Sequence, residues 1–265
     1  MAEAVISQGT TRGWEAAALR ALVDLRDLQL QKARVQFGNR LRAISAGEDA
    51  AVHEQREIVA RYYRAFNELE RLVTRDIAAL VQRYPIYHEV ARVRGVGPTL
   101  AAKTVALIGD IGRFDTVSKL WRFAGYAVVE GKAERRRAGE KAHYCGRLKV
   151  TCYLLGTSFL RLGSPYREVY DRAKERYAQT HPEWTPLHRH RAAQRVMVKI
   201  FLSHLWERWR LLEGLPVRSH YAADYLGHPT TLRPEQFGWG RAGGNGNGND
   251  SLELELECER EPGNQ

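Results

Sequence analysis

The first candidate for chemistry is a glycine-bracketed turn, Gly95-Val96-Gly97-Pro98, which has short apolar-periodic segments on both sides. Glycine allows a tight turn and lets another surface come close to the backbone. Pro98 suits the first turn of a following helix, because its missing N–H is not needed there. The N–H groups that open that helix, with the positive end of its dipole, can hold one phosphate. The pattern is that of a helix-hairpin-helix, and its alternative is a tight turn between two packed helices.

Basic side chains lie close to this turn in the sequence, and phosphate oxygens are the commonest nucleic-acid contact of such side chains. We therefore predict that the turn contacts DNA through Arg92, Arg94, Gly95, Val96, Gly97, Thr99 and Lys103.

A second candidate is the segment 131–149, which holds seven basic residues against two glutamates and has three glycines but no hydrophobic periodicity. This composition predicts a mobile loop that follows a phosphate backbone, in which His143 and Tyr144 can stack on a base or sugar. The alternative is a solvated charged loop. The predicted DNA contacts here are Lys132, Arg135, Arg136, Arg137, Lys141, Arg147 and Lys149.

Metal and disulfide chemistry have little support in the sequence. The three cysteines form no CxxC pair and leave one over in any pairing, which favours a reducing cytoplasm. His188 and His190 are two residues apart, so on a helix they point in different directions. Asp110 and Asp115 fit turn or cap positions. We therefore expect no bound metal or cofactor. A membrane span is not expected either, because no apolar run reaches the ~18 residues that it needs.

The charge favours a polyanionic partner. The formal net charge is +10 although the residues from Arg241 onward are mostly acidic, so the positive charge is concentrated in the rest of the chain. A surface of this kind attracts nucleic acid, and also membranes and acidic proteins.

The N-terminal segments have a heptad pattern of apolar residues. Val23, Leu30, Phe37 and Ile44 are seven residues apart, and after a break at 45–49 the spacing resumes with Val52, Val59, Phe66, Val73 and Leu80, with Tyr62 and Leu69 at intermediate seam positions. This predicts either an antiparallel helical hairpin or a coiled coil shared between two chains.

Later signals predict further helices. Pro85 ends the second heptad helix, Val150 to Leu162 reads as an apolar helix, and Ser164-Pro165 and Thr185-Pro186 each read as a helix start. We predict an all-α fold with a helical hairpin at 1–84, a helix-hairpin-helix domain at 85–216 and an extended to disordered tail at 217–265.

Several short motifs resemble one known family. The chain is similar to the C-terminal domain of the insertion-sequence 110/116/902 transposases, on the residues Val93-Arg94-Gly95-Val96-Gly97-Pro98, Leu107-Ile108-Gly109-Asp110-Ile111, Arg113-Phe114 and Phe123-Ala124-Gly125-Tyr126, and more loosely up to about residue 215.

The resemblance implies a DNA recombinase, which in that family joins an RNase H-like domain with four metal-binding carboxylates to a nucleophilic serine. The first 85 residues read as helices that place their acids on heptad surfaces, so Mg²⁺ chemistry requires a catalytic partner in trans. Between Val129 and Lys149 the only hydroxyl is that of Tyr144, which makes it the sole candidate nucleophile there.

We therefore expect a transposase-like protein that binds DNA, and with it structured RNA, acting in transposition or site-specific recombination. We expect it to be cytoplasmic and nucleoid-associated, and homo-oligomeric through its N-terminal helices. The alternatives are a non-catalytic architectural or regulatory DNA-binding protein derived from such an enzyme, and a helical interaction protein whose basic surface meets an acidic partner.

Overall fold

A computed structural model describes residues 16–44, 50–129, 132–133, 139, 142–217 and 232–240. The chain divides into two compact units, residues 1–83 and 84–265, which are described separately below. The predicted all-α fold is confirmed for the described part, apart from two strands of two residues each. None of the described helices is long and apolar enough to cross a membrane.

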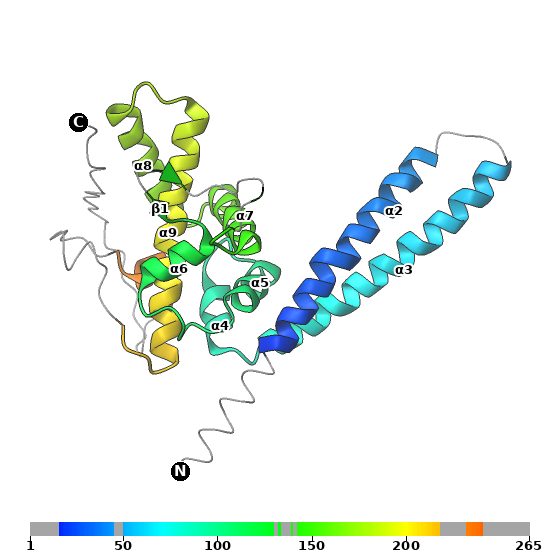
Figure 1. Cartoon of the computed structure of the whole chain (residues 1–265), viewed down its shortest axis with the longest axis horizontal. Helices are drawn as coiled ribbons and strands as arrows, with labels where there is room; N and C mark the ends of the chain where they lie inside the picture. The colour runs from blue at the N-terminus through cyan, green and yellow to red at the C-terminus, as the bar shows by residue number, and fades with distance from the viewer. Residues whose placement is uncertain are drawn as a thin grey trace, which may run out of the picture. The chain divides into compact units, whose positions relative to one another are not determined.

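The first unit is a helical hairpin. Residues 16–24 are helical and continue through one π-helical stretch, η1 (Leu25–Leu30), into α2 (Gln31–Ile44). The long helix α3 (Ala50–Val81) then runs back alongside α2 and η1 (Figure 1). The hairpin alternative of the sequence analysis is therefore the one that the chain adopts by itself.

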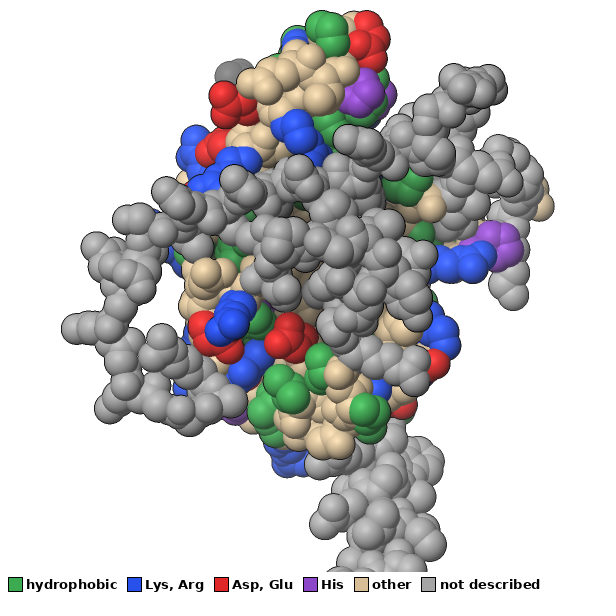
Figure 2. Space-filling view, turned by 90° about the vertical axis from the view of Figure 1, so that its left-hand side faces the viewer, with side chains coloured by type: hydrophobic (Ala, Val, Ile, Leu, Met, Phe, Trp, Pro, Cys, Tyr) green, Lys and Arg blue, Asp and Glu red, His purple; other side chains and the backbone are tan. Residues whose placement is uncertain are grey.

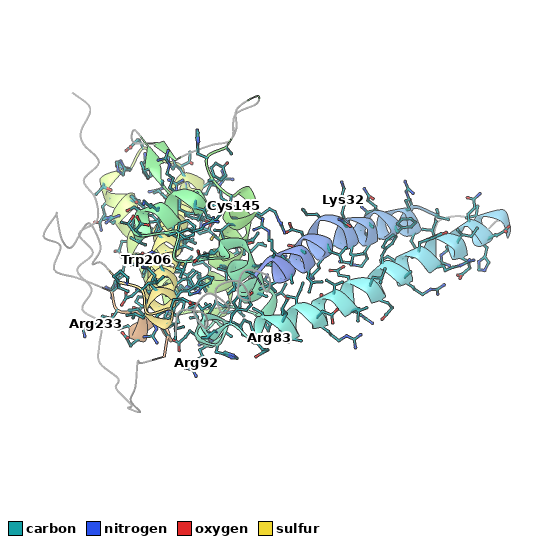
Figure 3. The ribbon with its side chains drawn as sticks, turned by 60° about the horizontal axis from the view of Figure 1, so that its bottom comes forward. Lys32, Arg83, Arg92, Cys145, Trp206 and Arg233 are labelled. Carbon is teal, nitrogen blue, oxygen red and sulfur yellow. The ribbon has the colours of Figure 1, made fainter. Side chains whose placement is uncertain are left out.

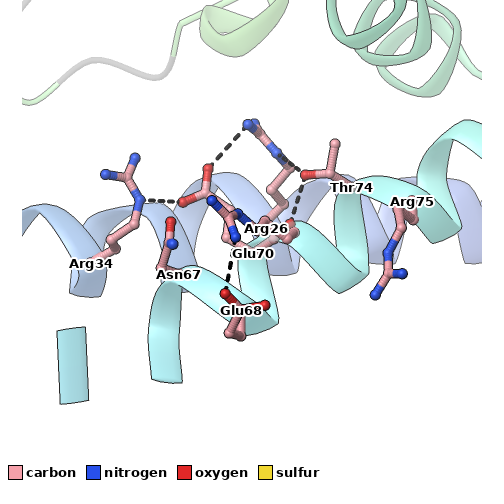
Figure 4. Close-up of a pocket in the computed structure, with 8 residues that line it drawn as sticks. Arg26, Arg34, Asn67, Glu68, Glu70, Thr74 and Arg75 are labelled. Atoms are coloured by element: carbon pink, nitrogen blue, oxygen red, sulfur yellow. Dashed lines mark hydrogen bonds and ion pairs between the residues drawn. The ribbon is translucent and has the colours of Figure 1, made fainter. Parts of the chain in front are cut away.

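The inner seam of α3 differs from the predicted one at its intermediate positions. Tyr62 and Leu69 are about half exposed, although the Tyr62 ring still lies 5.6 Å from the ring of Phe37. The neighbouring positions Tyr63, Glu70 and Ile77 face the first helix more fully. Glu70 can be buried there because its carboxylate accepts a charged hydrogen bond from Arg34 and forms an ion pair with Arg26, both on the opposite helix. Arg34 Nε lies 2.6 Å from Glu70 Oε2, and Arg26 Nη2 lies 3.1 Å from Glu70 Oε1 (Figure 4).

The second unit contains the remaining elements, in the order α4 (Pro85–Arg92), α5 (Pro98–Ile108), α6 (Val117–Ala124), β1 (Val128–Val129), β2 (Lys132–Ala133), α7 (Gly146–Leu162), α8 (Tyr166–Thr180), α9 (Pro186–Leu212) and the 3₁₀ helix η2 (Pro234–Phe237). The two strands pair antiparallel, with Val128 opposite Ala133. Helix α8 lies beside the beginning of α9 at the top of this unit in Figure 1, and α9 continues from there to the bottom of the unit.

Local signals set most helix ends. Pro85 and Pro98 each occupy the first residue of their helix, and Thr185 caps α9 by accepting a hydrogen bond from the N–H of His188 at 3.2 Å. Gly109 ends α5 with a positive φ of 74°. Each signal satisfies or removes a backbone group that a helix terminus would leave without a partner.

The long helix α9 forms the core of the second unit. Its residues Phe201, Leu205 and Trp206 are buried, and Trp206 points inward in Figure 3. Helix α7 crosses it closely at Gly156, where an added Cβ would lie 3.0 Å from side-chain atoms of both Gln194 and Val198. The glycine therefore sets the distance between the two helices.

Residues 232–240 differ from the extended to disordered tail that was predicted for 217–265. Phe237 and Trp239 are buried, and the Phe237 ring lies 4.6 Å from the ring of Tyr166. Trp239 Nε1 donates to the Tyr166 hydroxyl at 2.7 Å, and that hydroxyl lies 2.7 Å from His204 Nδ1. Contacts with distant aromatic residues thus order this segment, whereas the predicted disorder of 241–265 lies outside the described residues.

Candidate nucleic-acid interface

The turn between α4 and α5 has two differently used glycines. Gly95 has a φ of 98°, which side chains rarely adopt, and an added Cβ would lie 2.9 Å from Phe159 Cδ1 on α7. The Ser158 hydroxyl donates to the Gly95 carbonyl at 2.6 Å. One side of Gly95 therefore packs closely on α7, while its predicted contact with DNA stays a prediction.

Gly97 is the open half of the turn. It is exposed, caps α5 in an extended conformation, and has nothing within 4 Å of an added Cβ. Pro98 is also exposed, and Thr99 is half-buried. The start of α5 is thus accessible from the Gly97 side. The side chain of Val96 is buried, so only the backbone of Val96 could contact a phosphate.

The predicted cations of the turn have different surroundings. Arg94 is exposed within the turn itself, and Arg92 ends α4 on the outside of the unit (Figure 3) with its Nη1 3.6 Å from Glu89 Oε1. Lys103 lies half-buried on α5, one turn beyond Thr99. Arg92 and Arg94 are thus both exposed, and Arg94 is the nearer of the two to Gly97 along the chain.

The basic segment is shorter than predicted, because α7 begins at Gly146 and not at Val150. Arg147 and Lys149 therefore lie on the first turn of a helix, and Lys149 Nζ is 4.3 Å from the centroid of the Tyr144 ring. That ring also packs on Gly125, where an added Cβ would lie 2.9 Å from Tyr144 Cδ2. The side chains of Lys132, Arg135, Arg136, Arg137 and Lys141 lie outside the described residues.

The structure adds cation–aromatic pairs that the sequence analysis missed. The guanidinium of Arg113 is 4.7 Å from the ring of Phe114 and 4.4 Å from that of Phe123. Lys199 Nζ is 4.3 Å from the ring of Trp121. The adjacency of Arg113 and Phe114 in the sequence was a signal for the first group, but the distance in sequence from Trp121 to Lys199 left no signal for the second.

The titratable side chains Cys152, Tyr126 and Asp110 of this region have structural surroundings: the first two are buried, and the third accepts a hydrogen bond within a turn. Burial raises the pKa of the Cys152 thiol well above its usual range, and burial likewise raises the pKa of Tyr126. Such a thiol is a poor nucleophile, because only the thiolate attacks. Asp110 Oδ1 accepts from the Gly112 N–H at 2.7 Å, as expected for a turn residue. In the described part of the chain, no three metal-ligating side chains come together.

Charges on the surface are mixed. Over the face that Figure 2 shows, Lys and Arg side chains are interspersed with acidic and apolar ones.

Comparison with known proteins agrees with this geometry. Residues 87–170, from α4 into α8, match the Transposase IS116/IS110/IS902 family, and this match covers about a third of the chain. No curated protein matches the chain. The resemblance to this family that the sequence predicted is thereby confirmed over residues 87–170.

Proposed function

We propose that this protein binds DNA in transposition or site-specific recombination, with the open half of the α4–α5 turn as a phosphate contact. The observation that carries the proposal is that the two glycines of the turn have different surroundings. Gly95 anchors the turn to α7, whereas Gly97 leaves the start of α5 open. Backbone N–H groups at a helix start, together with the nearby cation of Arg94, suit a phosphate oxygen.

The basic segment is proposed as a second contact. Lys132, Arg135, Arg136, Arg137 and Lys141 would follow the phosphate backbone, and Arg147 and Lys149 would extend this contact onto α7. Because such contacts neutralise phosphates and release counterions, the affinity should fall steeply with salt and depend little on sequence.

The proposal also includes self-association of the chain and a catalytic partner. The protein would act in the cytoplasm at the nucleoid and self-associate through its N-terminal helices. As a recombinase it would take metal-binding carboxylates, and with them Mg²⁺, from a partner in trans, with Tyr144 as the candidate nucleophile. A purely architectural or regulatory DNA-binding protein is the alternative, and a strand-transfer assay with Mg²⁺ separates the two.

The test measures binding of fluorescent duplex DNA by anisotropy at several salt concentrations. Gly97→Val should weaken binding without unfolding the protein, because valine can adopt the φ of −76° at this position and its side chain would project into the open space. Arg94→Gln should weaken binding and lower the slope of log affinity against log salt by about 1. Arg167→Gln is the matched control, because Arg167 is exposed on α8 and pairs with Asp171.

The outcomes separate the candidate functions. DNA affinity that Gly97→Val and Arg94→Gln leave at the wild-type level would refute the turn as a contact. A protein without salt-dependent DNA affinity would instead favour structured RNA or an acidic protein as the partner, and competition with each would identify which.

A further inference from the structure

Helix α3 carries a second apolar stripe that its own hairpin covers only in part, since the Tyr62 ring lies 5.6 Å from the Phe37 ring of α2. Ile58, Tyr62, Leu69 and Leu72 are between 43% and 51% exposed, and Ala65 is exposed between them. Their spacing of four, three, four and three residues is the heptad pattern of a coiled-coil seam. This exposed seam lies about 100° around the helix from the inner seam at Tyr63, Glu70 and Ile77, since successive residues are rotated by about that angle.

The charges beside the exposed seam alternate in sign. Glu54, Arg61, Glu68 and Arg75 are seven residues apart and all exposed, so they form one row along its outer flank. The opposite flank consists of Val59, Phe66 and Val73, which face the first helix of the hairpin and are half-buried or buried. The outer row is therefore the flank that can pair with charges of another helix, and within it Glu68 Oε1 lies 3.1 Å from Arg71 Nη1 of the same helix.

We propose that two copies of this chain associate through the exposed seams of their α3 helices, in antiparallel orientation. In this arrangement Ile58 of one copy packs on Leu69 of the other, and Tyr62 packs on Ala65, so that a large side chain meets a small one. The inference specifies the self-association proposed above and does not depend on the DNA contact.

The outer charges select this orientation and register. In the antiparallel pair, Arg61 of each copy faces Glu68 of the other, and Glu54 faces Arg75, which gives four attractive pairs. A shift by one heptad would instead place Glu68 opposite Glu68 or Arg61 opposite Arg61. In a parallel pair the same charges would face the apolar flank of Val59 and Phe66, where they have no partner.

The contact has the dimensions of a short coiled coil. From Glu54 to Arg75 the paired stretch of α3 is about 33 Å long, at 1.5 Å per residue. The depression that Figure 4 shows is lined by Arg26, Arg34, Glu70, Thr74 and their neighbours, which include Glu68 and Arg75 of the outer row. The ion pairs of Glu70 with Arg26 and Arg34, which join the two helices of the hairpin, do not involve the outer row.

Analytical ultracentrifugation of the nuclease-treated full-length protein tests the inference over a wide concentration range at physiological ionic strength. Wild type should be a dimer, and Leu69→Glu a monomer with unchanged far-UV circular dichroism. Arg61→Glu should raise the dimer dissociation constant by about tenfold or more, because it turns two attractions into two repulsions. The double swap Arg61→Glu with Glu68→Arg should restore dimerisation.

Arg64→Glu is the matched control, because Arg64 carries the same charge on the side of α3 away from the exposed seam and lies 3.4 Å from Glu57. A monomeric wild type would overturn both the proposed self-association and this inference. A dimer that survives Leu69→Glu, that responds equally to Arg61→Glu and Arg64→Glu, or that the double swap does not restore, would overturn the antiparallel seam and leave self-association standing.

Discussion

The two glycines of the α4–α5 turn should respond in opposite ways to alanine. At Gly95 an alanine must adopt a φ of 98°, at a cost of about 1–2 kcal/mol, and its Cβ would lie 2.9 Å from Phe159 Cδ1 and 3.4 Å from Phe159 Cα. Overpacking of that kind costs about 1–3 kcal/mol. The two terms together predict a loss of roughly 2–5 kcal/mol of unfolding free energy in the second unit.

Gly97→Ala should leave stability within about 0.5 kcal/mol of wild type. Its φ of −76° and ψ of 159° are open to any residue, and nothing lies within 4 Å of the new Cβ. The alanine reduces the entropy of the unfolded chain by a few tenths of a kcal/mol and gives up a similar part of the helix-cap preference, so the two effects nearly cancel.

Thermal unfolding followed by tryptophan fluorescence is the suitable assay, because five of the six tryptophans lie beyond residue 84. Gly95→Ala should lower Tm by roughly 5–15 °C, since each kcal/mol corresponds to about 2–4 °C in a unit of this size. Equal losses of Tm in the two variants, or a larger loss for Gly97→Ala, would refute the assignment of Gly95 to packing and Gly97 to the open surface.

Three further substitutions test other parts of the structure. Gly156→Val should lower Tm, because its Cβ would already lie 3.0 Å from Val198 on α9, whereas Gly146→Val meets nothing within 4 Å and serves as the control. Glu70→Gln should destabilise the hairpin by about 3 kcal/mol in urea unfolding followed by circular dichroism, because it leaves the charge of Arg26 without its buried partner; an unchanged midpoint would show that the carboxylate contributes nothing. Burial, with Glu235 nearby, raises the pKa of Glu207, so the stability contribution of its neutral form is present at low pH and is lost as pH rises through that pKa. Glu207→Gln should therefore raise Tm at neutral pH and not at acid pH, and a lower Tm at neutral pH would contradict this reasoning.

Local chemistry in the sequence determined the helices and their ends. Pro85, Pro98 and Thr185 act on backbone groups within a few residues, so they could be read without knowing what packs nearby. The same holds for Gly109, whose positive φ ends α5. The match of residues 87–170 to a transposase family was likewise predictable, because short motifs around the turn carry it.

Only the tertiary structure decided which faces are used. Helix α3 has two apolar stripes of equal period, and the ion pairs of Glu70 with Arg26 and Arg34 on the opposite helix determine which one turns inward. Gly95 packs against Phe159, 64 positions away in sequence, a contact that no local pattern predicted. Residues 232–240 were expected to be extended or disordered, and they are ordered by Tyr166 and His204. Such choices depend on contacts between distant residues, and periodicity or composition along one segment does not contain them.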